Sequence, residues 1–446
     1  MKKVQLAANL FDSKFAMFWA VVVEGISASA KQMCYASLVC EAEGFAMSGA
    51  FQRIIWIVLD SVGIGALPDA AEYGDVGRST LGHIAESREL AIPNLVRMGL
   101  ANIAPLAHQT AERGPTGAYG KGATHSPGKD TTTGHWEMAG VWLDQAFPVY
   151  KHGFPAELIA EFEKQIGRKI VGNKPASGTE IIKELGEEHV RTGKPIVYTS
   201  GDSVFQIAAH EDVIPIQELY RMCEIARKLL DGPHRVGRVI ARPFAGTPGN
   251  FARTTRRHDY AVDPPKPMLM DVLAEKKVPV FGIGKIHDIY NGRGVEEYVT
   301  TVSNADGMKK ITGALPRRPA GLIFCNLVDF DMLYGHRKDV EGFAKSLEEF
   351  DRLLGGFLLQ LEKKDLLMIT ADHGCDPDPR WETTDHSREY VPILAYSPES
   401  GAGMNLGTRE TLADMGQTVA ENFGEAIPHG KSFLDALTGA ARDSIP

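Results

Sequence analysis

Three short apolar segments, each followed by acidic residues, constrain the fold of this chain more than any other feature. They are Arg53–Leu59 (RIIWIVL), Gly321–Val328 (GLIFCNLV) and Asp365–Thr370 (DLLMIT). None of them alternates between apolar and polar positions, which is typical of strands buried on both faces of a parallel sheet. Helical patterns such as residues 340–363 lie between them. This order predicts an α/β fold, whose sites gather at the carboxyl edge of the sheet.

The length of the chain predicts more than one domain. Its 446 residues exceed what one ordinary core holds. Residues 147–262 contain fewer long apolar runs and more Gly, Pro and basic side chains, and the stiff sequence DPPKP follows them. We therefore expect a domain at 147–262 inserted into a core formed by 50–146 and 263–446.

The first 49 residues read differently from the rest. An apolar stretch after several lysines loosely resembles a signal peptide. We favour a leader that is either not native or disordered, with translation beginning at Met47, just before the first predicted strand. A chain lacking residues 1–46 is therefore expected to fold and to stay active.

Composition excludes several classes of partner. The net charge of -9 argues against nucleic acid, because phosphate binding usually requires a basic surplus. No apolar run reaches the roughly 18 residues that a membrane helix needs, so no membrane partner is expected. The five cysteines form no CxxC pair and are odd in number, which indicates a reducing, cytoplasmic environment. A monomer is the default expectation.

Ligand-type side chains follow each of the three apolar segments. They are Asp60 after the first, Asp331 and His336 after the second, and Asp372, His373 and His386 after the third. One such Asp could be a helix cap and one such His a surface ring, but six at three strand ends favour a metal site. Mixed carboxylate and imidazole ligands suit Mn²⁺ or Zn²⁺. Two such cations could clamp the oxygens of a phosphoryl transfer.

The segment GKDTTTGHWEMAG at residues 128–140 places three hydroxyls in succession, Thr131 to Thr133. Such side chains often bond back to the backbone in a turn. The other interpretation is a nucleophile, because metal coordination is one of the few ways to activate a threonine hydroxyl. The predicted metal pair favours the second interpretation.

The chain resembles the bacterial-type phosphopentomutases of the alkaline phosphatase superfamily. The matching stretches, from Arg53 to about Leu434, are DSVGIGALPDA, GDVGRSTLGHIAE, GKDTTTGHWEMAG, GDSVFQIAAHE, ARPFAGTPGNFARTTRRHDYA, GKIHDIY, NLVDFDMLYGHR, TADHGCDPD and TTDHSREYVPILAY. The resemblance implies an alkaline-phosphatase-like core, with a mostly parallel sheet between helices, and an inserted smaller α+β cap domain. It also implies an isomerase that interconverts ribose 1-phosphate and ribose 5-phosphate, or the 2-deoxy forms, through a phosphothreonine and a 1,5-bisphosphate.

The resemblance also assigns roles to individual residues. Thr131, directly after the Asp of GKDT, would be the phosphorylated nucleophile. One Mn²⁺ would lie among Asp60, Thr131, Asp372 and His373, and the other among Asp331, His336 and His386, with other divalent cations possible. A small sugar phosphate would be bound through Asp202, Arg242, Arg256 or Arg257, and Lys285.

The sequence departs from the family pattern before its last predicted ligand. The stretch DHGCDPDPRWETTDH is about two residues longer than usual, and Cys375 takes a place usually held by Asn. Another phosphatase or phosphomutase of the superfamily remains an alternative, such as a cofactor-independent phosphoglycerate mutase, which normally uses Ser. A metal-binding protein without enzymatic activity is a third possible function. The stretch HGKSF lacks the spacing of a phosphate loop and is predicted to be a buried terminal strand.

Overall fold

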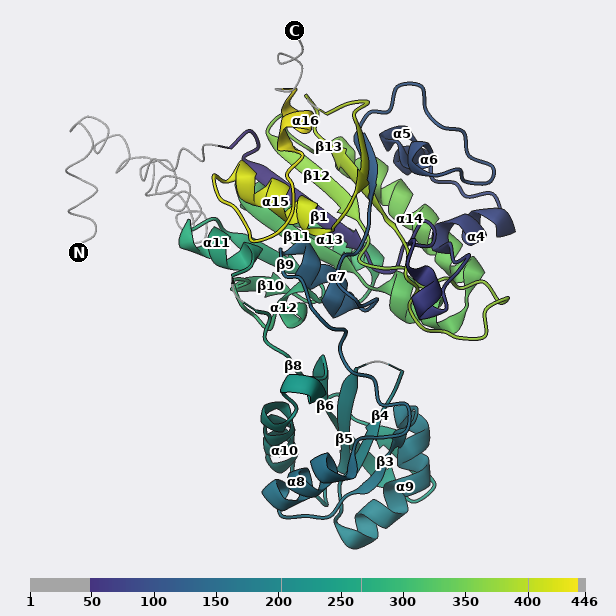
Figure 1. Ribbon diagram of the computed structural model, residues 1–446, viewed down its shortest axis with the longest axis vertical. Coiled ribbons are helices and arrows are strands. Elements are labelled where there is room, and N and C mark those ends of the chain that lie inside the picture. The colour runs from purple at the N-terminus through teal and green to yellow at the C-terminus, as the bar shows by residue number, and fades with distance from the viewer. Residues whose placement is uncertain (1–48, 202, 266, 400, 440–446) are drawn as a thin grey trace, which may run out of the picture. The chain divides into compact units, whose positions relative to one another are not determined.

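The larger sheet of the computed structural model confirms the predicted α/β architecture (Figure 1). The structure describes residues 49–439 except 202, 266 and 400, so the predicted leader lies outside the described residues. Eight strands follow the order β10-β9-β11-β1-β12-β13-β2-β14. β13 runs antiparallel to both of its neighbours, whereas the other adjacent pairs are parallel. The strands are β1 (Arg53–Leu59), β2 (Ala118–Gly122), β9 (Val280–Ile283), β10 (Glu297–Val299), β11 (Gly321–Leu327), β12 (Asp365–Thr370), β13 (Val391–Tyr396) and β14 (Asn405–Arg409).

The three apolar segments that precede the acidic residues form adjacent parallel strands in the middle of this sheet. β1 lies between β11 and β12, with Arg53 opposite Gly321 on one side and Asp365 on the other. Every residue of the three strands is buried. Their continuous apolar character therefore reflects helices on both faces, as the sequence predicted. Because the strands are parallel and in register, their carboxyl ends meet at one edge.

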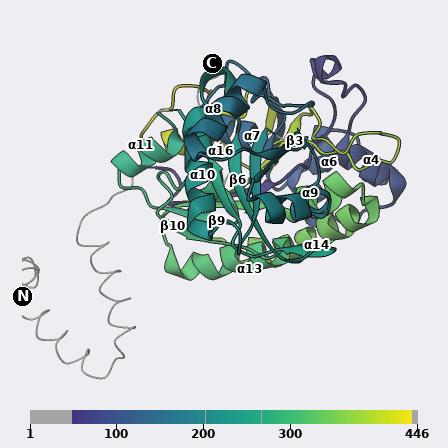
Figure 2. The same cartoon turned by 90° about the horizontal axis from the view of Figure 1, so that it is seen from below.

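Helices pack against the larger sheet. They are α4 (Thr80–Ser87), α5 (Pro93–Met98), α6 (Leu100–Ile103), α7 (Thr131–Met138), α11 (Leu269–Glu275), α12 (Ile286–Ile289), α13 (Asn304–Ala314), α14 (Val340–Leu358), α15 (Ala413–Asn422) and α16 (Leu434–Thr438). Figure 2 shows α13 and α14 along one face of the sheet. Short 3-10 turns cover Ala70–Tyr73, Gly232–His234, Leu315–Arg317 and Gly335–Arg337, and a π-helical turn covers Phe330–Tyr334. Among the described residues, no helix is both long and apolar enough to cross a bilayer.

The sequence pattern of α14 explains its position and its length. The carboxylate of Asp339 accepts a hydrogen bond from the backbone N–H of Gly342 and caps the first turn. The buried side chains Phe343, Leu347, Phe350 and Leu354 recur at spacings of four and three, so they form one stripe. The helix ends at Leu358, five residues before the predicted end at residue 363. The chain turns at residues 359–360, where Leu359 is exposed, and the polar residues 362–364 follow the buried Leu361.

One local prediction was wrong. The stretch HGKSF at residues 429–433 is a loop that leads into α16, not a terminal strand. Its glycine, Gly430, has a φ of 103°, which a residue in a regular strand does not adopt. A Cβ at this position would also lie 2.4 Å from the carbonyl oxygen of Ala413. The close approach of the backbone to α15 therefore sets the conformation of this loop.

A second, mixed sheet occupies residues 171–261. Its strands are β3 (Val171–Pro175), β4 (Ile196–Thr199), β5 (Val204–His210), β6 (Arg238–Thr247), β7 (Asn250–Arg253) and β8 (His258–Ala261), and its helices are α8 (Ala156–Ile166), α9 (Gly178–Thr192) and α10 (Ile216–Leu229). Alternate residues of β4 and β5 face two separate cores: Val197 and Phe205 lie in one, and Tyr198 and Ala208 in the other. These elements all fall within the range 147–262. Division into a core and an inserted cap domain stays a prediction.

Candidate metal centre

The ends of β1, β11 and β12 bring the predicted ligands to one edge of the larger sheet. Asp60 follows β1 directly, and Asp372 and His373 follow β12 within three residues. Asp331 lies on the π-helical turn after β11, and His336 on the 3-10 turn that follows it. Residues more than 300 positions apart in the chain therefore become neighbours because β1 lies between the other two strands.

One group of side chains forms around the ends of β1 and β12. The possible ligand atoms of Asp60, Asp372 and His373 all lie within 4.8 Å of one another. His373 Nε2 is 3.5 Å from Asp60 Oδ1 and 3.4 Å from Asp372 Oδ2. The Thr131 hydroxyl lies 3.3 Å from the same nitrogen. The structure thus brings together the four residues that the resemblance placed around one cation.

A second group forms beside the first. His336 Nε2 lies 3.4 Å from Asp331 Oδ2, and His386 Nε2 lies 3.3 Å from Asp331 Oδ1. The two imidazole nitrogens are 3.1 Å apart. The rings of His373 and His386 have centroids 4.0 Å apart, so the two groups are contiguous. The possible ligand atoms of Asp331, His373 and His386 also lie within 4.8 Å of one another, so His373 lies within reach of both groups.

Three buried carboxylate oxygens at this edge have no hydrogen-bond partner among the described residues. They are Asp60 Oδ1, Asp331 Oδ1 and Asp372 Oδ2. An imidazole nitrogen lies 3.2 to 3.5 Å from each of these oxygens, and the carboxylates also face one another. Burying a carboxylate without a hydrogen bond is unfavourable, so buried carboxylates are normally paired with cations or coordinate metals. Burial raises the pKa of Asp60 well above its usual value, the charges of Asp372 and Asp331 raise it further, and the nearby Lys285 opposes the shift. The donor set therefore fits divalent cations, which would neutralise this repulsion.

The imidazole tautomers also fit metal binding. His336 Nδ1 donates to the carbonyl oxygen of Thr384 at 2.7 Å, and His373 Nδ1 donates to that of Gly374 at 3.0 Å. A metal-ligating histidine commonly donates its other ring N–H to such an acceptor. In both residues the lone pair of Nε2 therefore faces the carboxylates.

His135 and Asn326, which the sequence reasoning did not select, contact residues of the first group. His135 is fully buried, and its Nδ1 lies 2.9 Å from the Thr131 carbonyl oxygen and 3.2 Å from Asp372 Oδ2. The amide nitrogen of Asn326 donates to Asp60 Oδ2 at 3.1 Å and lies 3.3 Å from His135 Nε2. The amide can donate both of its protons only if His135 Nε2 accepts one, so Nδ1 carries the ring proton. The sequence signals were their places in the matching stretches GKDTTTGHWEMAG for His135 and NLVDFDMLYGHR for Asn326.

The threonines after Asp130 have different environments. Asp130 caps α7: its Oδ1 accepts from the backbone N–H of Thr133 at 3.1 Å, and its Oδ2 accepts from the Thr133 hydroxyl at 2.6 Å. The turn interpretation and the nucleophile interpretation of the triple threonine therefore apply to different residues. The Thr133 hydroxyl bonds back to the chain, whereas the Thr131 hydroxyl faces His373.

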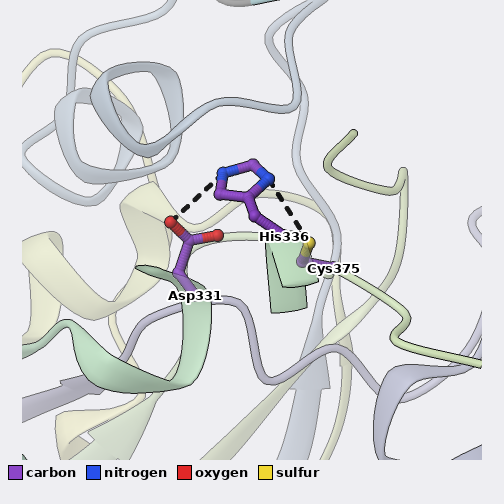
Figure 3. Close-up of side chains that lie close together, drawn as sticks. All are labelled: Asp331, His336 and Cys375. Atoms are coloured by element: carbon purple, nitrogen blue, oxygen red, sulfur yellow. Dashed lines mark hydrogen bonds and ion pairs between the residues drawn. The ribbon is translucent and has the colours of Figure 1, made fainter. Parts of the chain in front are cut away.

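Cys375 adds a thiol beside the second group, as Figure 3 shows. The possible ligand atoms of Asp331, His336 and Cys375 lie within 4.8 Å of one another. The Cys375 sulfur is 4.0 Å from His336 Nδ1 and 3.9 Å from the Thr384 carbonyl oxygen. Burial raises the pKa of the Cys375 thiol well above its usual value. Because Nδ1 already donates to Thr384, the thiol faces the protonated side of the ring.

A hydrogen-bonded neck closes the loop between His373 and His386. The backbones of Gly374 and Ser387 exchange two hydrogen bonds, of 3.1 and 2.8 Å, in an isolated antiparallel bridge. Each histidine directly precedes one residue of this bridge. The neck therefore fixes the separation of the two imidazoles.

The distal part of this loop has its own anchor. The indole N–H of Trp381 donates to Asp376 Oδ2 at 2.7 Å, and the guanidinium of Arg78 lies 4.3 Å above the indole ring. Lys338 donates to the Trp381 carbonyl oxygen. The distal part of the loop is thus anchored to Arg78 and Lys338.

The predicted phosphate-binding side chains of the second sheet are already paired. Arg242 Nε donates to Gln206 Oε1 at 3.1 Å, Arg256 pairs with Glu211, and Arg257 Nη2 lies 2.6 Å from Asp259 Oδ2. Burial and the charge of Arg257 lower the pKa of Arg242 to about 10, so it remains charged at neutral pH. Asp202 lies outside the described residues, and Lys285 precedes α12 in the larger sheet's part of the chain.

Comparison with known proteins agrees with the geometry. Residues 52–426 match the metalloenzyme superfamily. The chain is 58% identical over 388 residues to the phosphopentomutase of Desulfitobacterium hafniense, a match that covers 86% of this chain and 100% of that protein. It is 57% identical over 387 residues to the phosphopentomutase of Caldanaerobacter subterraneus subsp. tengcongensis, covering 86% and 98%. A solved phosphoglycerate mutase from Leishmania mexicana matches at 12% identity and a TM-score of 0.43, covering 85% of this chain and 96% of that chain.

Proposed function

Because this chain belongs to the phosphopentomutases of the metalloenzyme superfamily, we propose that it interconverts ribose 1-phosphate and ribose 5-phosphate, and their 2-deoxy forms. The family makes it an isomerase that acts by intramolecular phosphoryl transfer. The observation that carries the proposal is the Thr131 hydroxyl, which lies 3.3 Å from His373 Nε2 beside a cluster of buried carboxylate oxygens without hydrogen-bond partners among the described residues. We place the reaction in the cytoplasm, because the described cysteines are free thiols.

Thr131 is the nucleophile in this proposal. It is the first residue of α7, where unpaired backbone N–H groups and the helix dipole favour a negative charge such as a phosphate. The neighbouring Thr133 hydroxyl already donates to Asp130. His135 accounts for the orientation of the Thr131 backbone, because its ring N–H lies 2.9 Å from the Thr131 carbonyl oxygen.

Two divalent cations, which we propose to be Mn²⁺, would activate the hydroxyl and stabilise the charge of the transferring phosphoryl group when bound. The proposed ligands are Asp60, Thr131, Asp372 and His373 for one cation and Asp331, His336 and His386 for the other. The residues themselves supply the preorganisation. Asn326 holds Asp60, and backbone carbonyls hold the rings of His336 and His373.

The reaction would consist of two transfers. The O–P bond of phosphothreonine 131 breaks as the free hydroxyl of the pentose phosphate forms a new O–P bond, which gives a 1,5-bisphosphate. The bisphosphate then turns, and its other phosphoryl group returns to Thr131, so that no water is consumed. The inserted domain would bind the sugar phosphate through Asp202, Arg242 and Arg256 or Arg257, and Lys285 of the core would also contact it, because these residues match the family motifs.

Peptide mass spectrometry and a coupled assay test the proposal together. Wild-type protein incubated with radiolabelled ribose 1,5-bisphosphate should carry the label on the peptide that contains Thr131. The same protein should convert ribose 5-phosphate to ribose 1-phosphate, which a nucleoside phosphorylase consumes. Release of inorganic phosphate without isomerisation would indicate a phosphatase. Isomerisation of phosphoglycerate in place of pentose phosphate would indicate the other phosphomutase of the superfamily.

A further inference from the structure

Arg388 lies in the strand-like segment two residues after His386, and its guanidinium is 3% exposed. Each of its five N–H donors has an acceptor among the described residues. The acceptors are the carboxylate of Asp69 and the backbone carbonyl oxygens of Thr124, Ser126 and Gly128. The three carbonyls belong to the loop that precedes the proposed nucleophile.

All three nitrogens of the guanidinium take part in these hydrogen bonds. Nη1 donates to Ser126 and Gly128, both at 2.7 Å, and Nη2 donates to Thr124 at 2.8 Å. Nη2 also donates to Asp69 at 2.8 Å, and Nε points to the same carboxylate at 3.2 and 3.1 Å. Carbonyls spaced two residues apart converge on one side chain only in a sharply turned loop. The guanidinium therefore defines the conformation of the loop.

A second connection joins the same two segments. Asp75, which is buried, accepts from the backbone N–H of Arg388 at 2.9 Å and from Lys129 Nζ at 3.0 Å. Lys129 Nζ also lies 3.3 Å from Asp385 Oδ2. Lys129, just before the Asp130 cap, is thereby linked to Asp385 directly and to Arg388 through Asp75, on both sides of His386.

We propose that Arg388 is a positioning residue: it holds residues 124–128 against the segment that carries His386 and so places the Thr131 hydroxyl toward the carboxylate cluster. This inference rests on the proposed function of Thr131. Lysine cannot substitute, because an ammonium has three donors and no planar fork. A small displacement of the hydroxyl should suffice to slow the transfer, because reacting atoms must approach to about 3 to 3.5 Å.

Arg53 provides a matched control. It is also 3% exposed, it forms a fork with Asp365 at 2.9 and 2.6 Å, and its Nη1 donates to the carbonyl oxygens of Leu315 and Arg318. It stands at the first residue of β1, whereas Asp60 follows the last. Arg53→Lys therefore damages a comparable buried network at the other end of the strand.

The test compares Arg388→Lys with Arg53→Lys in the full chain loaded with Mn²⁺. Both variants should lower Tm. Only Arg388→Lys should lower kcat, by about 10 to 100-fold, as for other residues that orient a metal site's groups. Its KM for ribose 5-phosphate and its metal content should stay near wild type, and labelling of Thr131 by radiolabelled ribose 1,5-bisphosphate should slow in proportion to kcat.

Several outcomes would overturn the inference. An unchanged kcat in Arg388→Lys, an equal loss of kcat in Arg53→Lys, or a fall that follows lost metal would each show that Arg388 does not position the nucleophile. If Arg388→Lys does not fold, Asp69→Asn, which weakens one side of the fork, should lower kcat in the same direction by less, and an unchanged kcat would reject the inference. Failure of wild-type protein to label Thr131 would instead reject the proposed function on which it rests.

Discussion

The two sheets of the molecule differ in how completely their charged side chains are paired. At the carboxyl edge of the larger sheet, three buried carboxylate oxygens have no hydrogen-bond partner among the described residues. In the second sheet, each candidate arginine already has a partner: Arg242 has Gln206, Arg256 has Glu211 and Arg257 has Asp259. A group of buried carboxylate oxygens that lack hydrogen bonds points directly to a cationic ligand. A paired group can bind a ligand only by exchanging its partner.

The difference in exposure explains why both arrangements are stable. The side chains of Arg256 and Arg257 are 54% and 43% exposed, and an exposed ion pair contributes only about 0 to 1 kcal/mol. Such pairs can be exchanged for a phosphate at small cost. Asp60 and Asp372 are 0% and 1% exposed, so their charge can be tolerated only if something neutralises it. The larger sheet thus has a strict requirement for ligands that neutralise its carboxylates, whereas the arginines of the second sheet are stable with or without a bound phosphate.

The largest expected effect comes from the nucleophile. Thr131→Val should lower kcat by about 10⁴-fold or more, since only binding and electrostatic stabilisation remain once a nucleophile is removed. Metal content should stay close to wild type, because the carboxylates and imidazoles are untouched. Turnover of ribose 5-phosphate and labelling of the Thr131 peptide measure the effect. Thr132→Val is the control and should keep substantial activity; the reverse pattern would show that the wrong hydroxyl was chosen.

Loss of a carboxylate should come next and would test the strict requirement of the larger sheet. Asp331→Ala should lose one metal and nearly all transfer, because Asp331 lies between His336 and His386. Metal analysis after gel filtration measures the stoichiometry. Asp231→Asn, an exposed carboxylate of the second sheet's part of the chain, should change neither quantity. Two tightly bound equivalents in Asp331→Ala would exclude Asp331 as a ligand.

Loss of a basic side chain should have a smaller effect, confined to substrate binding. Arg242→Ala should raise KM for ribose 5-phosphate by about 10 to 100-fold, as expected for a hydrogen bond to a charged group worth roughly 1.5 to 3 kcal/mol. Metal content should not change. Arg168→Ala breaks a comparable pair, with Glu218, at a position with no predicted role and should leave KM unaltered. Equal KM values for Arg242→Ala and wild type would place the phosphate elsewhere.

The smallest effect is expected at Cys375. Cys375→Asn should leave kcat and Mn²⁺ content near wild type, because His336 Nδ1 donates to Thr384 and the thiol faces that protonated side of the ring. Loading with Cd²⁺ should give no thiolate charge-transfer absorption. A strong absorption that disappears in Cys375→Asn would identify the sulfur as a ligand.

The sequence predicted those parts of the fold and of the site that depend on strand order. Asp60, Asp331 and Asp372 could be grouped because each follows an apolar run, and parallel strands bring such positions to one edge. His135, Asn326 and Arg388 could not be selected in this way. Asn326 lies inside an apolar strand, and most acceptors of Arg388 are backbone carbonyls, which leave no trace in residue types.

The neck formed by Gly374 and Ser387 has a consequence for how this enzyme tolerates change. Both imidazoles are set at the base of the loop, whereas the Thr384 carbonyl oxygen, further along the loop, accepts a hydrogen bond from His336 Nδ1. The loop can therefore change length without altering the spacing of His373 and His386, but only where the change leaves the Thr384 carbonyl oxygen on His336. For the protein engineer, a segment grafted into this loop has to preserve that contact as well as the neck.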